Sequence, residues 1–199
     1  SFHDFGFDLG GPLLKDRVWV WGAIGRVHSD LLALDGSPDD SELGTRGIKA
    51  EALWHPSVRV NGAYYYNEKL ENGRDAGPAR PRETTWQQSG PSRYFKGEGN
   101  FTMRNLFASL RGAYVDAGFV LLPTVPFRDY YIDGGGVAHN SYYQHQTHRP
   151  QHYFGGDGSY FHGVHEVRFG GGWRSTTADT QREWPASQLV ASWTGYPNM

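Results

Sequence analysis

The sequence predicts an all-β fold, namely part of an antiparallel, up-and-down transmembrane β-barrel to which this chain contributes about seven strands. Three observations support this prediction. Apolar residues recur with a period of two in several segments, which is typical of strands. Short and long connections alternate along the chain, and each predicted strand has one face that carries almost no charge.

The composition favours strands and turns and excludes several classes of protein. Glycine, with 27 of 199 residues, is about twice as frequent as usual, and aromatic residues make up 15% of the chain. The net charge of −2 argues against a nucleic-acid partner. No stretch of the sequence approaches the roughly 20 apolar residues that a membrane-spanning helix requires. Because cysteine is absent, disulfides, thiolate metal sites and a cysteine nucleophile are excluded.

The first predicted strand is residues 17–27, whose opening residues Val18 to Trp21 are apolar on both faces. Residues 48–54 alternate between apolar and polar positions, and so do residues 58–69 after the breaker His55-Pro56-Ser57. These two segments therefore form a predicted hairpin with a tight connection.

Two further hairpins follow the same pattern. Residues 94–103 and 106–115 alternate strongly and are joined by a short turn at Arg104-Asn105. The third hairpin is weaker, with arms in residues 151–161 and 166–174 and a turn near His162-Gly163.

The order of the connections favours a barrel over a soluble sandwich. The turns within the three hairpins are tight, whereas residues 28–46, 70–93, 116–144 and the tail after Arg174 form long connections rich in Gly, Pro, Asp and Ser. Transmembrane barrels have short turns at one end and longer loops at the other. A sandwich has no physical reason to sort its loops in this way.

The chemistry of the two strand faces agrees with a barrel. A charged side chain on the lipid side costs roughly 2 to 4 kcal/mol at the bilayer midplane, so the uncharged face is expected to face lipid. Several aromatic residues fall on that face: Tyr64, Tyr66, Phe95, Phe101, Tyr114, Phe169 and Trp173. The opposite face would line a wet interior, where its polar residues contact a plug domain, keep the interior hydrated or line a ligand route. These predicted lumen-facing residues are Lys49, Glu51, Arg59, Asn61, Lys96, Glu98, Asn100, Arg111, Glu166 and Arg168. A half-buried soluble sheet would alternate similarly.

A specific resemblance lies near the beginning of the chain. Here Gly10-Gly11-Pro12, the triplet Lys15-Asp16-Arg17 and an aromatic strand, Val18-Trp19-Val20-Trp21, follow one another. This order resembles the plug-to-barrel junction of TonB-dependent outer-membrane receptors, particularly the Oar-like group. Two later segments also resemble this group: one begins at Tyr94-Phe95-Lys96-Gly97, and the other is Ser159-Tyr160-Phe161 followed by His165-Glu166-Val167-Arg168. The Gly-Gly-Pro triplet itself suits a sharp exit of the chain before a strand.

The resemblance implies that residues 1–16 are the junction and residues 17–199 the amino-terminal, incomplete part of an outer-membrane barrel. It also implies the partners: outer-membrane lipid, the receptor's own plug domain and the TonB energy-coupling system. The plug, the coupling segment and the carboxypeptidase-regulatory-like domain of this group would all lie upstream. We therefore expect an internal piece of a longer Gram-negative receptor that takes up or binds a ligand.

Other candidate chemistry is weak. Six of the nine histidines lie close in sequence, namely His139, His145, His148, His152, His162 and His165. Their spacing matches no strong zinc signature, and Pro150 interrupts any helix that would align them, so we expect no metal site and no cofactor. The glycine-rich segments 133–136 and 155–158 lack the context of phosphate loops, and no nucleophile motif is present, so we expect no enzyme.

Two alternatives remain open. The first is a soluble all-β binding module, for example for carbohydrate, that uses aromatic loop residues to stack on a sugar or a peptide. The candidate residues for such stacking are Tyr130, Tyr131, Tyr142 and Tyr143. The second alternative is a surface adhesion protein built on the same barrel.

Overall fold

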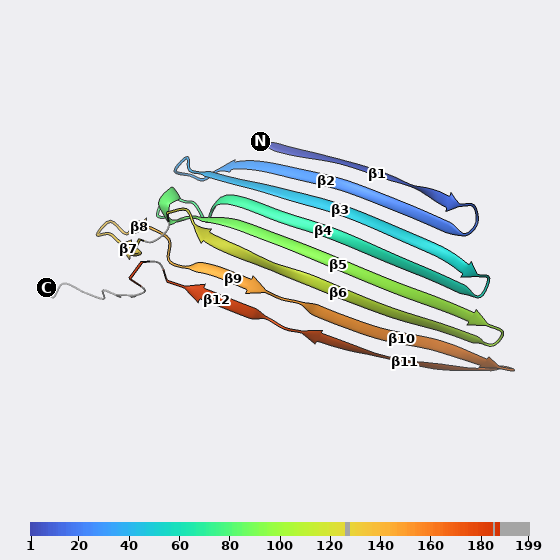
Figure 1. The fold of residues 1–199 in the computed structure, drawn as a ribbon. Coiled ribbons are helices and arrows are strands. Elements are labelled where there is room, and N and C mark those ends of the chain that lie inside the picture. The colour runs from blue at the N-terminus through green and yellow to red at the C-terminus, as the bar shows by residue number, and fades with distance from the viewer. Residues whose placement is uncertain (126–127, 185, 188–199) are drawn as a thin grey trace.

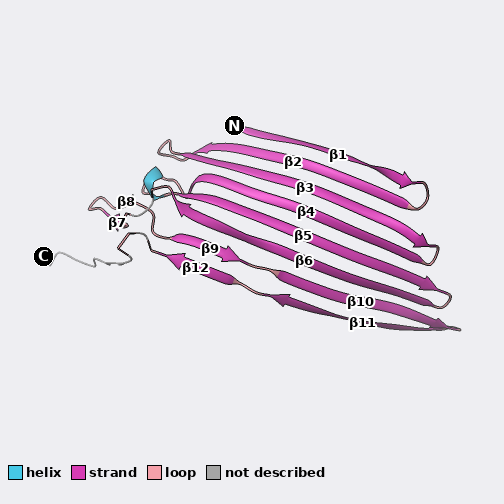
Figure 2. Cartoon of the chain, viewed as in Figure 1, coloured by secondary structure: helices cyan, strands magenta, loops and turns pink. Residues whose placement is uncertain are grey.

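The structure, a computed structural model, describes residues 1–125, 128–184 and 186–187. Most of this part of the chain belongs to one antiparallel sheet of ten strands (Figure 1). Its strands are β1 (Phe2–Leu14), β2 (Val18–Leu32), β3 (Pro38–His55), β4 (Val58–Arg74), β5 (Trp86–Met103), β6 (Leu106–Pro123), β9 (Gln144–His148), β10 (Gln151–His162), β11 (His165–Thr176) and β12 (Asp179–Glu183). A short pair, β7 (Tyr131–Ile132) and β8 (Ala138–His139), and a 3-10 turn, η1 (Arg82–Thr84), lie in the loops (Figure 2).

The sheet is a meander in which chain neighbours are also neighbours in space. The strand order runs β1-β2-β3-β4-β5-β6-β10-β11, while β9 pairs with β6 and β12 pairs with β9. Strands β9 and β12 thus continue β10 and β11 beyond short breaks, so the sheet has eight long arms where the sequence predicted about seven. In the described residues β1 and β11 are edge strands, and the sheet is open.

Tight turns gather at one end of the sheet and longer connections at the other, as the sequence predicted (Figure 1). The tight turns are residues 15–17, 56–57, 104–105 and 163–164, and the longer connections are residues 33–37, 75–85 and 124–143. The longer connections are shorter than predicted, because β3 to β6 extend by up to ten residues beyond the alternating segments. Residues 188–199 of the predicted tail lie outside the described residues.

The expectation of a sharp chain exit at Gly10-Gly11-Pro12 is wrong. All three residues lie inside β1, which pairs with β2 from Phe2 to Leu14. Proline is tolerated there because β1 is an edge strand, where a missing backbone donor need not break a ladder. The alternation of Phe5, Phe7 and Leu9 with polar or small residues is the signal that could have predicted this strand.

Left-handed backbone marks several of the connections. Asp16 and Arg104 have φ values of 60° and 43°, and each lies in a tight turn. Gly73 has a φ of 84°, and a Cβ atom there would collide with the carbonyl oxygen of Pro38. Glycine at residue 73 therefore allows the end of β4 to approach β3 closely.

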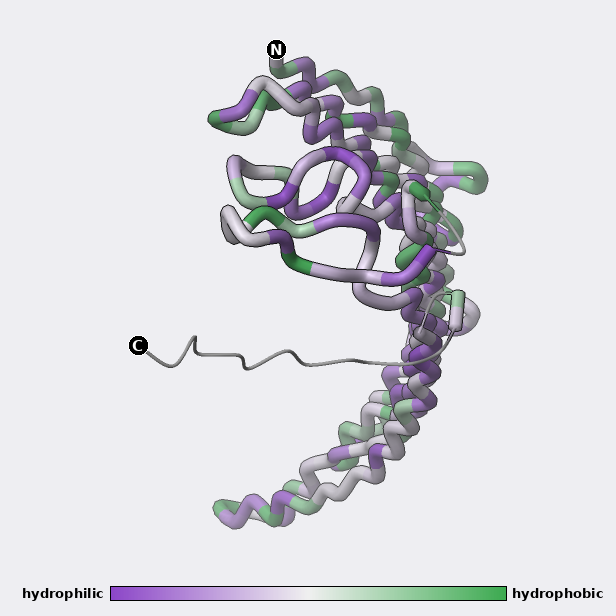
Figure 3. Tube along the Cα trace, turned by 90° about the vertical axis from the view of Figure 1, so that its left-hand side faces the viewer, coloured by the Kyte–Doolittle hydropathy of each residue, from purple (hydrophilic) through white to green (hydrophobic). Residues whose placement is uncertain are grey.

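The sheet is strongly curved, and the loops bend toward its inner side (Figure 3). Residues directly opposite each other in paired strands share a face. Trp86 of β5 and Leu121 of β6, each covered by loop residues, share a face with Glu71 and His145. We call this face the concave face and the opposite one the convex face.

Burial is concentrated where the loops meet the concave face. Most of the buried residues lie there: Thr84, Thr85, Trp86, Leu121, Ala138, Asn140, Ser141, His145 and Thr147. Elsewhere the sheet is a single layer, so large apolar side chains such as Phe7 and Phe169 remain exposed. Among the described residues no helix is long and apolar enough to cross a membrane.

Candidate functional site: the concave face and its loop-end cluster

The strand register places all ten predicted polar residues on the concave face. Glu51 of β3 lies opposite Asn61 of β4, which lies opposite Glu98 of β5, which in turn lies opposite Arg111 of β6. The same row continues to Gly155 of β10 and Gly172 of β11, and Arg168 lies opposite Ser159 on the same face, nearer the tight turns. The predicted residues therefore form one continuous surface across the sheet.

Short-range charge pairs cover this surface. Arg59 Nε lies 3.5 Å from Glu51 Oε1, and Lys96 Nζ lies 3.4 Å from Glu98 Oε2. Asn100 Nδ2 donates a hydrogen bond of 3.1 Å to Glu98 Oε1. Arg168 forms a two-pronged pair with Glu166 at 2.8 and 2.9 Å. The positive and negative charges of these pairs cancel locally. The surface is therefore polar and hydrated, without a strong net charge of either sign.

One member of this surface was missed from the sequence. Asp157 of β10 forms an ion pair with Arg111. Asp157 lies in residues 151–161, the predicted first arm of the third hairpin, and the structure places it inside a twelve-residue strand. Only the pairing of β10 with β6 brings this carboxylate opposite Ser109, next to Arg111.

The convex face carries an uncharged band next to the tight turns. On β5 and β6 the band spans residues 95–103 and 106–114, where each convex-facing residue is apolar, aromatic or glycine. This length is close to the roughly 9–11 residues that a transmembrane strand needs.

A row of aromatic rings bounds the uncharged band on the loop side. Tyr64 and Phe95 have ring centroids 4.7 Å apart, Phe95 and Tyr114 are 6.3 Å apart, and Tyr114 and His152 are 4.8 Å apart. The next convex row toward the loops is charged. In it Arg93 Nη1 lies 3.2 Å from Asp116 Oδ2, and His148 Nε2 lies 2.7 Å from Asp116 Oδ1.

The loops close over the loop end of the concave face through specific hydrogen bonds. Trp86 Nε1 donates to the carbonyl oxygen of Tyr143 at 2.6 Å, and Ser141 Oγ donates to the carbonyl oxygen of Thr85 at 3.0 Å. Asn140 Nδ2 donates to the carbonyl oxygen of Asp129 at 2.8 Å. The first two bonds tie Tyr143 and Ser141 to Trp86 and Thr85, and the third joins two parts of the same connection, so residues 128–143 are a packed part of the fold.

Aromatic and arginine side chains form a cluster at the same place, which we call the loop-end cluster: Arg80, Trp86, Phe119, Tyr130, Tyr142, Tyr143, His145, Arg149, Arg182 and Trp184. Tyr143 contacts the ring of Trp86 at 5.3 Å, and the Arg182 guanidinium lies 5.3 Å from the Tyr143 ring. The Arg80 guanidinium lies 5.0 Å from the Trp86 ring. Most of these rings pack on one another, while Tyr142 remains 37% exposed.

His139 links the two longest connections. Its Nδ1 lies 2.7 Å from Glu83 Oε1 and its Nε2 lies 3.1 Å from Asp133 Oδ2, while its ring stacks on Tyr131 at 4.6 Å. The hydrogen bonds that the ring donates to Asp133 and then to Glu83 raise the pKa of His139 above 6.5. A protonated His139 therefore joins the two loops by charge as well as by hydrogen bonding.

His145 has the opposite environment. It is buried in the loop-end cluster, and its Nδ1 accepts a 3.2 Å hydrogen bond from Arg182 Nε. Burial first, and then the charges of Arg182 and Arg149, lower the pKa of His145 below 6.5. This imidazole is therefore neutral in the folded protein at neutral pH.

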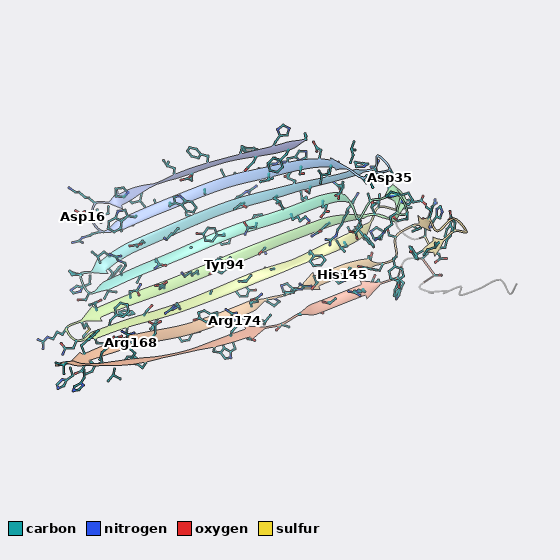
Figure 4. All side chains as sticks on the ribbon, turned by 180° about the vertical axis from the view of Figure 1, so that it is seen from behind. Asp16, Asp35, Tyr94, His145, Arg168 and Arg174 are labelled. Carbon is teal, nitrogen blue, oxygen red and sulfur yellow. The ribbon has the colours of Figure 1, made fainter. Side chains whose placement is uncertain are left out.

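The other histidines are distributed over the sheet. His148 and His152 lie on the convex face, and His162 lies opposite His165 beside a tight turn. In residues 1–125, 128–184 and 186–187 no group of three or more His, Cys, Asp or Glu residues could hold a metal ion. Figure 4 shows His145 toward the loop end of the sheet and Arg168 near the turns.

The four tyrosines predicted to stack on a ligand do not form one platform. Tyr143 packs inside the loop-end cluster, and Tyr130 contacts Tyr142 edge-on at 5.1 Å. Tyr131 is 54% exposed but covers His139 on its other side. Tyr131 and Tyr142 are thus the two rings of the four that present the most surface to a ligand.

Comparisons with family models, with curated proteins and with solved structures found no significant match to this chain.

Proposed function

We propose that the chain is a barrel segment of a TonB-dependent, Oar-like outer-membrane receptor that takes up or binds a ligand at the cell surface. The observation that carries the proposal is the convex band, which is free of charge over residues 95–103 of β5 and is followed by an aromatic row and then a charged row. Lipid-exposed strands require this order of uncharged, aromatic and charged residues, because aromatic side chains prefer the interface and charges are costly within the hydrocarbon.

The concave face and the loops support the same proposal. A closed barrel would turn the paired charges of the concave face into a hydrated interior, where Glu98 and Arg111 contact a plug domain or the permeating ligand. β5 and β6 are each 18 residues long, about twice what a bilayer requires, so their loop-side halves would project beyond the membrane. The packed loops and the loop-end cluster then form the surface that meets ligand first.

The barrel proposal also accounts for the open edges of the sheet. Strands β1 and β11 each present unpaired backbone groups on one side, which is unfavourable in lipid. In the proposed receptor, additional strands pair with both edges and close the barrel. The TonB system acts on this receptor through segments upstream of the barrel.

Cell fractionation tests the proposal directly. An antibody against the connection of residues 75–85 is used to probe separated outer-membrane and soluble fractions of the source cells. We expect the signal in the outer membrane, released only by detergent. Signal confined to the soluble fraction would contradict the proposal.

The exposed rings of Tyr131 and Tyr142 support a second candidate, a soluble carbohydrate-binding module. A soluble location together with binding to immobilised oligosaccharides would favour this second function. An outer-membrane location without ligand uptake would instead favour an adhesion protein on the same barrel.

A further inference from the structure

The two ends of the sheet differ in how their cations are balanced. In the loop-side half, four cations have an acidic partner close by: Arg26 with Glu42, Lys69 with Glu71 at 2.5 Å, Arg80 with Asp75 at 3.7 Å, and Arg93 with Asp116 at 3.2 Å. Each of these four pairs is electrically neutral.

The tight turns instead carry cations without partners. Lys15 and Arg17 lie in the β1–β2 turn, and Arg104 lies in the β5–β6 turn. All three side chains are exposed, and among the described residues none has a side-chain hydrogen bond or ion-pair partner. Asp16 is the one acidic residue in the four turns, and Figure 4 shows it at this end of the sheet.

Large apolar side chains surround these cations. Around the turns, the exposed apolar residues are Leu13, Leu14, Trp54, Met103, Leu106 and Val164. Trp54 is 83% exposed and Val164 is 96% exposed, so neither is covered by the sheet. Apolar side chains beside unpaired cations match the boundary between hydrocarbon and headgroups, where long basic side chains extend toward the polar layer.

The spacing of the turns argues for a layer of anions rather than a single ligand. Neighbouring strands lie roughly 4.8 Å apart, so the β1–β2 and β5–β6 turns, four strand spacings apart, are separated by about 19 Å. One small anion cannot contact Lys15, Arg17 and Arg104 together. A surface of many headgroups can contact each of them.

We propose that the turn end of the sheet binds anionic phospholipid headgroups, with Lys15, Arg17 and Arg104 contacting their phosphates. This inference rests on the membrane location proposed above and adds to it the charge of the lipid on the turn side. Each cation near a charged bilayer strengthens binding roughly fivefold, and salt screens the effect.

Vesicle flotation of the full chain tests this inference. The chain is mixed with vesicles of phosphatidylcholine alone, or of phosphatidylcholine with phosphatidylglycerol, and the bound fraction is measured against lipid concentration. We expect binding to both, roughly tenfold or more tighter with phosphatidylglycerol at low salt. The triple variant K15Q/R17Q/R104Q should lose most of this preference while still binding phosphatidylcholine.

A matched variant separates the turn end from net charge. R26Q/R46Q/R93Q also removes three formal positive charges, but from the loop-side half of the convex face, and should keep the preference. Equal binding of the unaltered chain to both lipids, or equal loss of preference in both variants, would overturn this inference alone. Absence of binding to phosphatidylcholine would contradict the membrane location itself, and with it this inference.

Discussion

Two histidines near the loops, His139 and His145, have opposite electrostatic environments although they are only six positions apart in the sequence. His139 lies between the carboxylates of Glu83 and Asp133, and His145 is buried beside Arg182. The first environment favours the imidazolium and the second favours the neutral ring. The same residue type therefore responds to pH in opposite directions within one cluster of loops.

An NMR titration of the histidine side chains checks this difference. We expect His139 to titrate above 6.5 and His145 below it. Because the pKa of His139 is raised, its contribution to loop packing is fully present below pH 6.5 and is lost as pH rises through the raised value. Because the pKa of His145 is lowered, folding is destabilised as pH falls below 6.5, where the unfolded state binds the proton first.

Two variants separate the causes of the His139 shift. Asp133→Asn should lower the titration midpoint of His139, because Asp133 makes the largest contribution to the shift. Asp116→Asn, which alters the partner of His148 on the convex face, should leave it unchanged. A midpoint for His139 at or below that of His145 in the unaltered chain would contradict the arrangement of Glu83 and Asp133 described here.

Individual strands show how closely the two environments of the sheet are spaced. On β4, Val60 lies on the convex face opposite Ala52 and Gly99, while Asn61 lies on the concave face opposite Glu51 and Glu98. Successive residues of a strand point to opposite sides. Two adjacent residues of one strand therefore have different surroundings. Val60 lies in the uncharged band, and Asn61 lies between two glutamates.

Lysine substitution at these adjacent residues tests the assignment of the faces. Val60→Lys should lower the free energy of unfolding in a lipid bilayer by roughly 2 to 4 kcal/mol, because it places a charge in the apolar band. Asn61→Lys should change it by less than about 1 kcal/mol, because the new cation lies between two carboxylates. Denaturant titration of the chain folded in vesicles measures both.

The losses of unfolding free energy in these two variants show which face of the sheet contacts lipid, and so distinguish the membrane receptor from the soluble module. A larger loss for Asn61→Lys than for Val60→Lys would mean that the concave face is the more apolar environment. That result would be incompatible with a convex face in lipid.

The sequence predicted the alternating parts of the strands but not their loop-side ends, because the period-two pattern depends only on neighbouring residues. Alternation identified residues 48–54, 58–69 and 94–115 as strands and turns, and each lies inside an observed hairpin. Residues 38–46 and 86–93 were predicted as loops because Pro, Gly and Ser occur there. These segments are strands because both neighbours supply ladder hydrogen bonds, which outweigh weak local propensity.

At the scale of the whole molecule, the sheet has two open edges and a well-paired centre. Strands β4 and β5 are paired on both sides over most of their length, whereas β1 and β11 are paired on one side. Backbone amides that lack a partner strand exchange with solvent more readily. The stability of the chain should therefore decrease from the centre of the sheet toward its edges.

Hydrogen–deuterium exchange with peptide-level mass spectrometry measures this gradient. We expect peptides from β4 and β5 to exchange most slowly, and those from β1 and β11 to exchange fastest among the long strands. Peptides from residues 138–143 should be protected although they belong to a long connection, because Ala138, Asn140 and Ser141 are buried. Slow exchange of both β1 and β11 would show instead that each edge has acquired a partner strand.

The sequence by itself determined which side chains share a strand face and where the three predicted hairpins turn, because a period of two is a property of neighbouring residues. The tertiary structure decided what lies beside what across the sheet: Arg111 next to Asp157, Trp86 beneath Tyr143, and His139 between Glu83 and Asp133. These contacts join residues 46 to 57 positions apart in every case but one, and they depend on strand register and sheet curvature. Register arises from the summed pairing of whole strands, and no local pattern contains it.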